Sequence, residues 1–86
     1  MNNKLPDLTH ASACYQYAYR VLKGPFPLGE AAIAEDGDYS YWYATETLKA
    51  PFPLGEPAIK EISELWGKYQ ERFPNREYLA VQDFDS

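Results

Sequence analysis

Apolar side chains recur along the first third of the chain at the spacing of one helix face. The members of this stripe are Ala11, Cys14, Tyr15, Ala18 and Leu22. Their i, i+3, i+4, i+7 pattern predicts an amphipathic helix. Thr9 or Ser12 is expected to cap its N-terminus, because a hydroxyl there accepts from a free backbone N–H. At the other end, Gly24 is expected to take the left-handed conformation and Pro25 to prevent continuation.

A proline-flanked aromatic residue follows this helix. Residues 25–27 read Pro-Phe-Pro, and they are predicted to be extended because a residue before proline is disfavoured in the α region. Phe26 is therefore held on a stiff segment and is expected to fill the gap between successive helices. Residues 30–35 then predict a short helix, which the Asp-Gly pair at 36–37 ends in a turn.

The second half of the chain predicts two further helices. Asp38 is expected to cap a helix from Tyr39 to about Lys49. Pro57 fits the first turn of a fourth helix, where a missing backbone donor costs nothing. This short helix is expected to run on into a long one, closed by Pro74, because its apolar stripe continues across four turns. That stripe comprises Ile59, Ile62, Leu65, Trp66, Tyr69 and Phe73.

A duplicated unit underlies these patterns. The hexapeptide Pro-Phe-Pro-Leu-Gly-Glu occurs at residues 25–30 and again at 51–56, and the offset from Pro25 to Pro51 defines the repeat period. Over residues 15–35, 14 of 21 positions are identical to those of residues 41–61. A period of this size is typical of a small supersecondary element stacked on its own copy. We predict an all-α fold, a small bundle of four to five helices built from two short-long helical repeats.

The length of 86 residues fits a single domain. We expect repeat 1 at about residues 12–37 and repeat 2 at about residues 38–63. Residues 64–86 are expected to form a C-terminal helix extension and tail, with one helical turn at 77–81. A terminal unit that departs from the repeat consensus suits the end of a stack.

The charge balance narrows the classes of partner. Thirteen acidic and eight basic residues give a net charge of −5, which argues against direct nucleic-acid binding and is compatible with a basic protein partner. No apolar run approaches the length of a membrane span. A lone cysteine and an N-terminus without a signal sequence favour a cytoplasmic location.

His10 and Cys14 are the only residues of their types and could share a helix face. Two ligands do not complete a zinc site, and a Cys–His nucleophile pair would need a third group to orient the base. The five glycines are scattered singly, so no phosphate-binding loop is present. We therefore predict that the protein is not an enzyme and uses no metal or cofactor.

Acidic side chains gather at residues 35–38 and 56–64. The first group is expected to be a solvated turn that includes one helix cap. The second is expected to be an exposed helix face on which Glu64 pairs with Lys60 and Lys68 at i, i+4 spacing. Acid–base catalysis would require a carboxylate removed from water beside a cleft, and this pattern does not indicate one.

Fourteen of the 86 residues are aromatic, and eight of these are tyrosines. Residues two positions apart on a helix diverge by roughly 200°, so the rings cannot all share one face. Two interpretations stay open: the outer rings pack on the neighbouring repeat, or several of them line a protein-binding surface. The rings concerned are Tyr15, Tyr17, Tyr19, Tyr39, Tyr41, Trp42 and Tyr43.

The pattern Tyr-x-Tyr-Ala-x-x-x-Leu-Lys-x-Pro-Phe-Pro-Leu-Gly-Glu, at residues 15–30 and 41–56, resembles a tandem helical repeat of phage and prophage proteins. The resemblance covers residues 15–61, and this chain differs from those longer arrays in having only two units. Small size, acidity and the lack of catalytic groups together resemble anti-CRISPR proteins, which occupy a nucleic-acid-handling complex of the host.

The resemblance implies a binding-only inhibitor that docks an acidic, aromatic-rich surface on a basic surface of a host defence complex. The alternative is a scaffold module that self-associates or serves phage assembly, so that the protein is a monomer or a homodimer. The location implied is the host cytoplasm. The candidate partner contacts are Glu35, Asp36, Asp38, Tyr39, Trp42 and Glu46.

Overall fold

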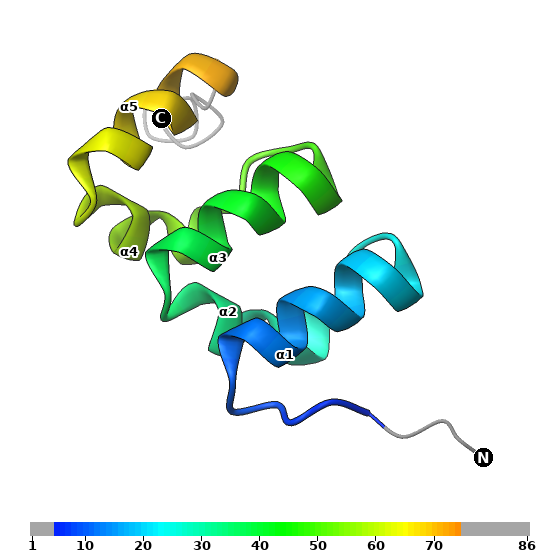
Figure 1. The fold of residues 1–86 in the computed structure, drawn as a ribbon. Helices are drawn as coiled ribbons and strands as arrows, with labels where there is room; N and C mark the ends of the chain where they lie inside the picture. The colour runs from blue at the N-terminus through cyan, green and yellow to red at the C-terminus, as the bar shows by residue number, and fades with distance from the viewer. Residues whose placement is uncertain (1–4, 75–86) are drawn as a thin grey trace, which may run out of the picture.

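In the computed structural model, which describes residues 5–74, every regular element is a helix (Figure 1). In chain order the elements are α1 (Ala11–Gln16), η1 (Tyr17–Leu22), η2 (Pro27–Gly29), α2 (Glu30–Ala34), α3 (Gly37–Trp42), η3 (Tyr43–Leu48), η4 (Pro53–Gly55), α4 (Glu56–Lys60) and α5 (Ser63–Arg72). The segments η1 and η3 continue α1 and α3 with wider, π-type turns, and η2 and η4 are 3-10 turns that lead into α2 and α4. The all-α prediction is confirmed.

The five α-helices of the described part of the chain repeat one pattern, a long helix followed by a short one. Residues 11–34 hold the first pair and residues 37–60 the second. The helix α5 follows as a further long helix. Figure 1 shows α1, α3 and α5 in succession, with α2 and α4 along one side. The predicted C-terminal tail, with its helical turn at 77–81, lies outside the described residues.

The predicted continuous helix from α4 into α5 is wrong. The chain leaves α4 at Glu61 and Ile62, whose N–H groups bond to the carbonyls of Ala58 and Ile59 at 3.2 and 2.9 Å. Ile62 is extended, at φ −114° and ψ 92°, and a new helix starts at Ser63. The prediction failed because the apolar spacing from Ile59 to Phe73 is the same for one continuous helix as for two helices joined by a turn.

Both predicted N-terminal caps are also wrong. The residue that precedes α1 is His10, which makes no side-chain cap bond, and the hydroxyl of Thr9 instead donates to Asp7 Oδ1 at 2.6 Å. Before α3, the extended residue is Asp36, and its carboxylate accepts from the Tyr39 N–H at 3.0 Å. Asp38 lies within the first turn of α3 and is exposed.

The long helices end where the prolines predict, but the left-handed residue is not Gly24. Lys23 and Lys49 both take φ 55°. The next N–H, from Gly24 or Ala50, then reaches back to the carbonyl of Ala18 or Ala44 at 3.2 Å. Because the second copy has alanine at this step, glycine is not required there.

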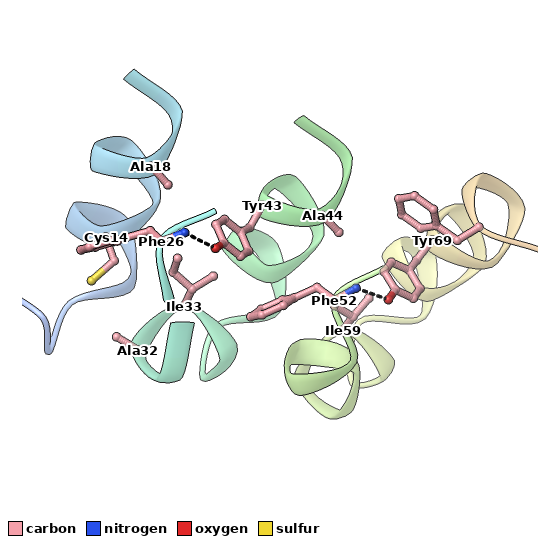
Figure 2. Close-up of a cluster of buried hydrophobic side chains, with 11 residues drawn as sticks. Cys14, Ala18, Phe26, Ala32, Ile33, Tyr43, Ala44, Phe52, Ile59 and Tyr69 are labelled. Atoms are coloured by element: carbon pink, nitrogen blue, oxygen red, sulfur yellow. Dashed lines mark hydrogen bonds between the residues drawn. The ribbon is translucent and has the colours of Figure 1, made fainter. Parts of the chain in front are cut away.

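The core lies between the long and short helices. Phe26 and Phe52 are 4% and 3% exposed, which confirms that they are structural plugs. Figure 2 shows the buried side chains as one cluster that runs along the stack. The buried apolar residues are Cys14, Ala18, Phe26, Ala32, Ile33, Tyr43, Ala44, Phe52, Ile59, Tyr69 and Phe73.

A buried tyrosine joins each repeat to the one before it. The Phe26 N–H donates to the Tyr43 hydroxyl at 2.8 Å, and that hydroxyl donates to Glu30 at 2.7 Å. At the next interface the Phe52 N–H donates to the Tyr69 hydroxyl at 2.9 Å (Figure 2). The Tyr69 hydroxyl donates to a carboxylate at 2.6 Å. The carboxylate is Glu56, which is buried, so the prediction of a solvated face at 56–64 is wrong at this position.

Candidate functional site

Four aromatic rings from α1–η1 and α3 form one cluster across the first repeat interface. Tyr15 stacks on Tyr19 with 5.7 Å between ring centroids, and it meets Tyr39 at 5.4 Å. Trp42 lies 6.3 Å from Tyr15 and 5.4 Å from Tyr39, against which it packs edge-on. These separations fall in the range of favourable aromatic pairs.

The Tyr–Trp cluster, defined as these four rings, stays partly open to solvent. Tyr19 is 46% exposed and Trp42 is 40% exposed. The rings line a shallow groove of about 390 Å³ together with Gln16, Arg20 and Glu46. The interpretation that the outer rings pack on the neighbouring repeat is confirmed. Part of their surface also faces outward, and a protein-binding role for it stays a prediction.

The stack itself does not require this cluster. At the next interface, one repeat period further on, only one of the four rings has an aromatic counterpart: Tyr15 corresponds to Tyr41. The other three rings are replaced there by smaller or charged side chains, namely Thr45, Leu65 and Lys68. Since α3 and α5 pack together without them, three of the four rings are surplus to the repeat architecture.

The structure brings together half of the predicted contact residues. Tyr39, Trp42 and Glu46 line the groove. Asp36 does not, because its carboxylate caps α3. The remaining two carboxylates are exposed and lie outside the groove lining; Glu35 follows α2, and Asp38 is in the first turn of α3.

Three cations near the cluster were missed by the sequence reasoning. A second groove of about 700 Å³ adjoins the first and is lined by Arg20, Lys23 and Lys49, with Glu46 among them. Figure 1 shows α1 and α3 running in the same direction, so the ends of η1 and η3 lie together. Charges far apart in sequence are gathered there, which no local pattern indicates.

The surface is therefore graded along α3 and η3. Glu35 and Asp38 stand at the N-terminal end and the aromatic rings lie in the middle. At the C-terminal end, three cations outnumber the single carboxylate of Glu46; they are Arg20, Lys23 and Lys49. Burial raises the pKa of the Tyr15 phenol above its usual value, and the nearby Glu46 carboxylate raises it further. The Tyr15 phenol therefore stays neutral at the middle of this surface.

The thiol of Cys14 is the one cysteine nucleophile of the chain, and it is fully buried. Its Sγ donates to the Asp7 carbonyl at 3.5 Å, and burial raises the pKa of the thiol. Both effects lower the fraction of reactive thiolate. His10 instead contacts the Asp7 carboxylate, with 2.9 Å between Nδ1 and Oδ2.

Metal and ion-pair chemistry is sparse in residues 5–74. No three His, Cys, Asp or Glu side chains gather there in a way that could hold a metal ion. Glu64 contacts Lys68 at 3.8 Å, as the i, i+4 spacing predicts. Lys60 lies over the Trp66 ring, 5.3 Å from its centroid, and makes a cation–π contact.

None of the protein-family models, curated proteins or solved structures compared with this chain matches it. Within residues 5–74, no helix combines the length and apolar character needed to cross a bilayer.

Proposed function

We propose that this protein is a non-enzymatic binding protein that docks on another protein through the Tyr–Trp cluster. The observation that carries this proposal is the surplus of rings: three of the four have no aromatic counterpart at the next repeat interface. Tyrosine and tryptophan supply much of the binding energy at protein interfaces, because each buries a large area and keeps a polar group at its edge.

The partner surface proposed is a basic, nucleic-acid-binding face of a host defence complex, in the manner of an anti-CRISPR inhibitor. The support is twofold. The repeat motif resembles that of phage and prophage proteins, and three exposed carboxylates lie on or next to α3 and η3, the helix that carries Tyr39 and Trp42; they are Glu35, Asp38 and Glu46. Such a protein would block the complex by occupying the surface on which nucleic acid is held.

The test begins with capture from a bacterial lysate on immobilised protein, with wild type and Trp42→Ala side by side. The captured partner is then purified and its affinity measured. We expect Trp42→Ala to weaken binding at least tenfold, about 1.4 kcal/mol. Leu54→Ala is the matched control, since Leu54 is also a large exposed apolar residue but does not line either groove. Equal affinity of all three proteins would overturn the proposal.

Three further measurements establish the mode of action. The Asp38→Lys variant should slow association, and rising salt should weaken the complex, if charge steers the encounter. Adding the protein should then release nucleic acid from the partner. A partner that retains nucleic acid in the bound state would exclude the inhibitor mechanism and leave only the binding function.

A specific observation favours a second candidate, a self-associating scaffold module. The graded surface is self-complementary: in an antiparallel pair, the carboxylates at one end would meet the lysines at the other, and the rings would meet in the middle. Sedimentation of the purified protein distinguishes the two functions. A dimer that Trp42→Ala dissociates would favour the scaffold, and a monomer would favour the inhibitor.

A further inference from the structure

Three tyrosines share one register in this chain. Tyr17, Tyr43 and Tyr69 follow one another at the repeat period. The second and third each bind the hexapeptide of the preceding repeat through one hydroxyl, which accepts from a phenylalanine N–H and donates to a glutamate. Tyr17 stands at the corresponding place on the first long helix.

The ring of Tyr17 is already held in the binding position. It packs on Phe26 with 4.8 Å between centroids, the same separation as between Tyr43 and Phe52, with the rings tilted by 49° in place of 74°. Tyr43 is fully buried, whereas Tyr17 is only half-buried. Among the residues described, nothing bonds to the Tyr17 hydroxyl.

The turn before α1 imitates the end of a short helix. The Asp7 carbonyl accepts from the His10 N–H at 3.2 Å and from the Cys14 thiol. The Ile33 carbonyl, one repeat period later, accepts from Asp36 and Ser40 in the same way. The N-terminal end of α1, around Cys14, is thus covered as if another repeat preceded it.

The C-terminal part of the same helix, around Tyr17 and Val21, has no such cover from residues 5–10. Val21, one turn beyond Tyr17, is 61% exposed. Its counterpart Thr47 lines the groove that faces the preceding repeat, so Val21 faces outward from the stack. In sequence, the position one repeat period before Glu30 is Lys4. The chain therefore has no glutamate at the position that would accept from the Tyr17 hydroxyl.

We propose that the outer side of α1 and η1 is a receptor for a Pro-Phe-Pro-Leu-Gly-Glu-type segment supplied by another protein. Such a segment presents the N–H of an aromatic residue between two prolines and, further along, a carboxylate; one tyrosine hydroxyl binds these two groups at both internal interfaces. A folded second copy does not supply it, because Tyr43 and Tyr69 already occupy both of its hexapeptides.

The probe is a synthetic peptide with the sequence of residues 49–61, titrated into the isotope-labelled full chain. We expect chemical-shift changes at the amides of Tyr17 and Val21. Tyr17→Phe should weaken binding at least fivefold, because the hydroxyl supplies both hydrogen bonds. Tyr19→Phe is the matched control, since Tyr19 belongs to the Tyr–Trp cluster on the same helix and should bind the peptide like wild type.

A second peptide with an N-methylated phenylalanine lacks only the N–H donor and should bind at least fivefold more weakly. Equal binding of both peptides would overturn the proposal. So would shifts centred on Tyr43 or Tyr69, which would mean that the peptide displaces an internal contact, or an absence of shifts at millimolar peptide. The Trp42→Ala variant should bind the peptide like wild type. The peptide experiment therefore tests this receptor separately from the proposed function of the Tyr–Trp cluster.

Discussion

At the scale of single residues, one tyrosine hydroxyl makes hydrogen bonds to two partners at each repeat interface. Tyr69 accepts from the Phe52 N–H at 2.9 Å and donates to Glu56 at 2.6 Å. Tyr43 does the same with Phe26 and Glu30, and burial, with the Glu30 carboxylate, raises the pKa of its phenol well above the usual value. Tyr43 is therefore a neutral donor and acceptor at any ordinary pH.

Replacement of Tyr69 by phenylalanine should destabilise the protein by about 1–3 kcal/mol. The ring is kept, but the Phe52 N–H and the Glu56 carboxylate each lose the Tyr69 hydroxyl in a buried environment. Urea unfolding of wild type and Tyr69→Phe measures the difference. Tyr17→Phe is the control and should change the free energy of unfolding by less than about 0.5 kcal/mol. A loss of the same size in both variants would mean that the hydroxyl bonds contribute nothing specific.

These residue roles were only partly predictable from the sequence. Phe26 was recognised as a plug because two prolines fix its backbone locally. The hydrogen bonds of Tyr69 were not predicted, because their partners, Phe52 and Glu56, lie in the preceding repeat. The position of Tyr69 in the sequence also fits an ordinary apolar helix stripe. The repeat period carries the missing signal: Tyr69 continues the register of Tyr17 and Tyr43, although the surrounding Tyr-x-Tyr-Ala motif is lost.

At the scale of the elements, helix ends set by proline were predicted well, and the caps were not. A proline forbids a helix by its own geometry, whereas Asp36 and Asp38 are both good caps and only the backbone path decides between them. The same holds for the break at Ile62, an apolar residue with no helix-ending property of its own.

The hexapeptide glycine should be essential to how the short helices pack. A Cβ at Gly55 would lie 2.6 Å from the Ser40 Cβ and 2.7 Å from the Phe52 ring. Gly55→Ala should therefore destabilise the protein by about 1–3 kcal/mol through overpacking. Thermal and urea unfolding both measure this.

The matched control is the same substitution in an open part of α5. A Cβ added at Gly67, in the middle of the helix, would meet nothing within 4 Å. Gly67→Ala should stabilise the protein by about 0.5–1 kcal/mol, because alanine loses less conformational entropy on folding. If Gly55→Ala were instead neutral, the close packing of η4 against α3 would be wrong.

At the scale of the whole molecule, the candidate site depends on contacts that the sequence pattern does not contain. Ring spacing indicated that some aromatic side chains face outward, and Trp42 does. The cations beside it come from Arg20, Lys23 and Lys49, which meet only because two parallel helices end at the same level. The acidic surface expected from net charge is consequently graded along α3 and η3 from acidic to basic.

The stacked architecture also predicts where the molecule is most stable. Ala18 and Ala44 are both fully buried, both follow a tyrosine, and occupy equivalent places in their repeats. The repeat of Ala44 is packed on both sides, by α1 and by α5, whereas that of Ala18 has a folded neighbour on one side in the described structure. In a stack whose stability is a sum of nearest-neighbour contacts, the end unit opens at a lower free energy.

Hydrogen exchange of the two alanine amides tests this directly, because an identical preceding residue keeps their chemical exchange rates similar. We expect the Ala44 amide to exchange at least tenfold more slowly than that of Ala18, a difference of about 1.4 kcal/mol in opening free energy. The Tyr69→Phe variant weakens the contact of this repeat with α5. It should therefore accelerate hydrogen exchange at the Ala44 amide and bring its rate closer to that of the Ala18 amide. Equal protection in the wild type would instead mean that the whole stack opens as one cooperative unit, since no repeat could then open without the others.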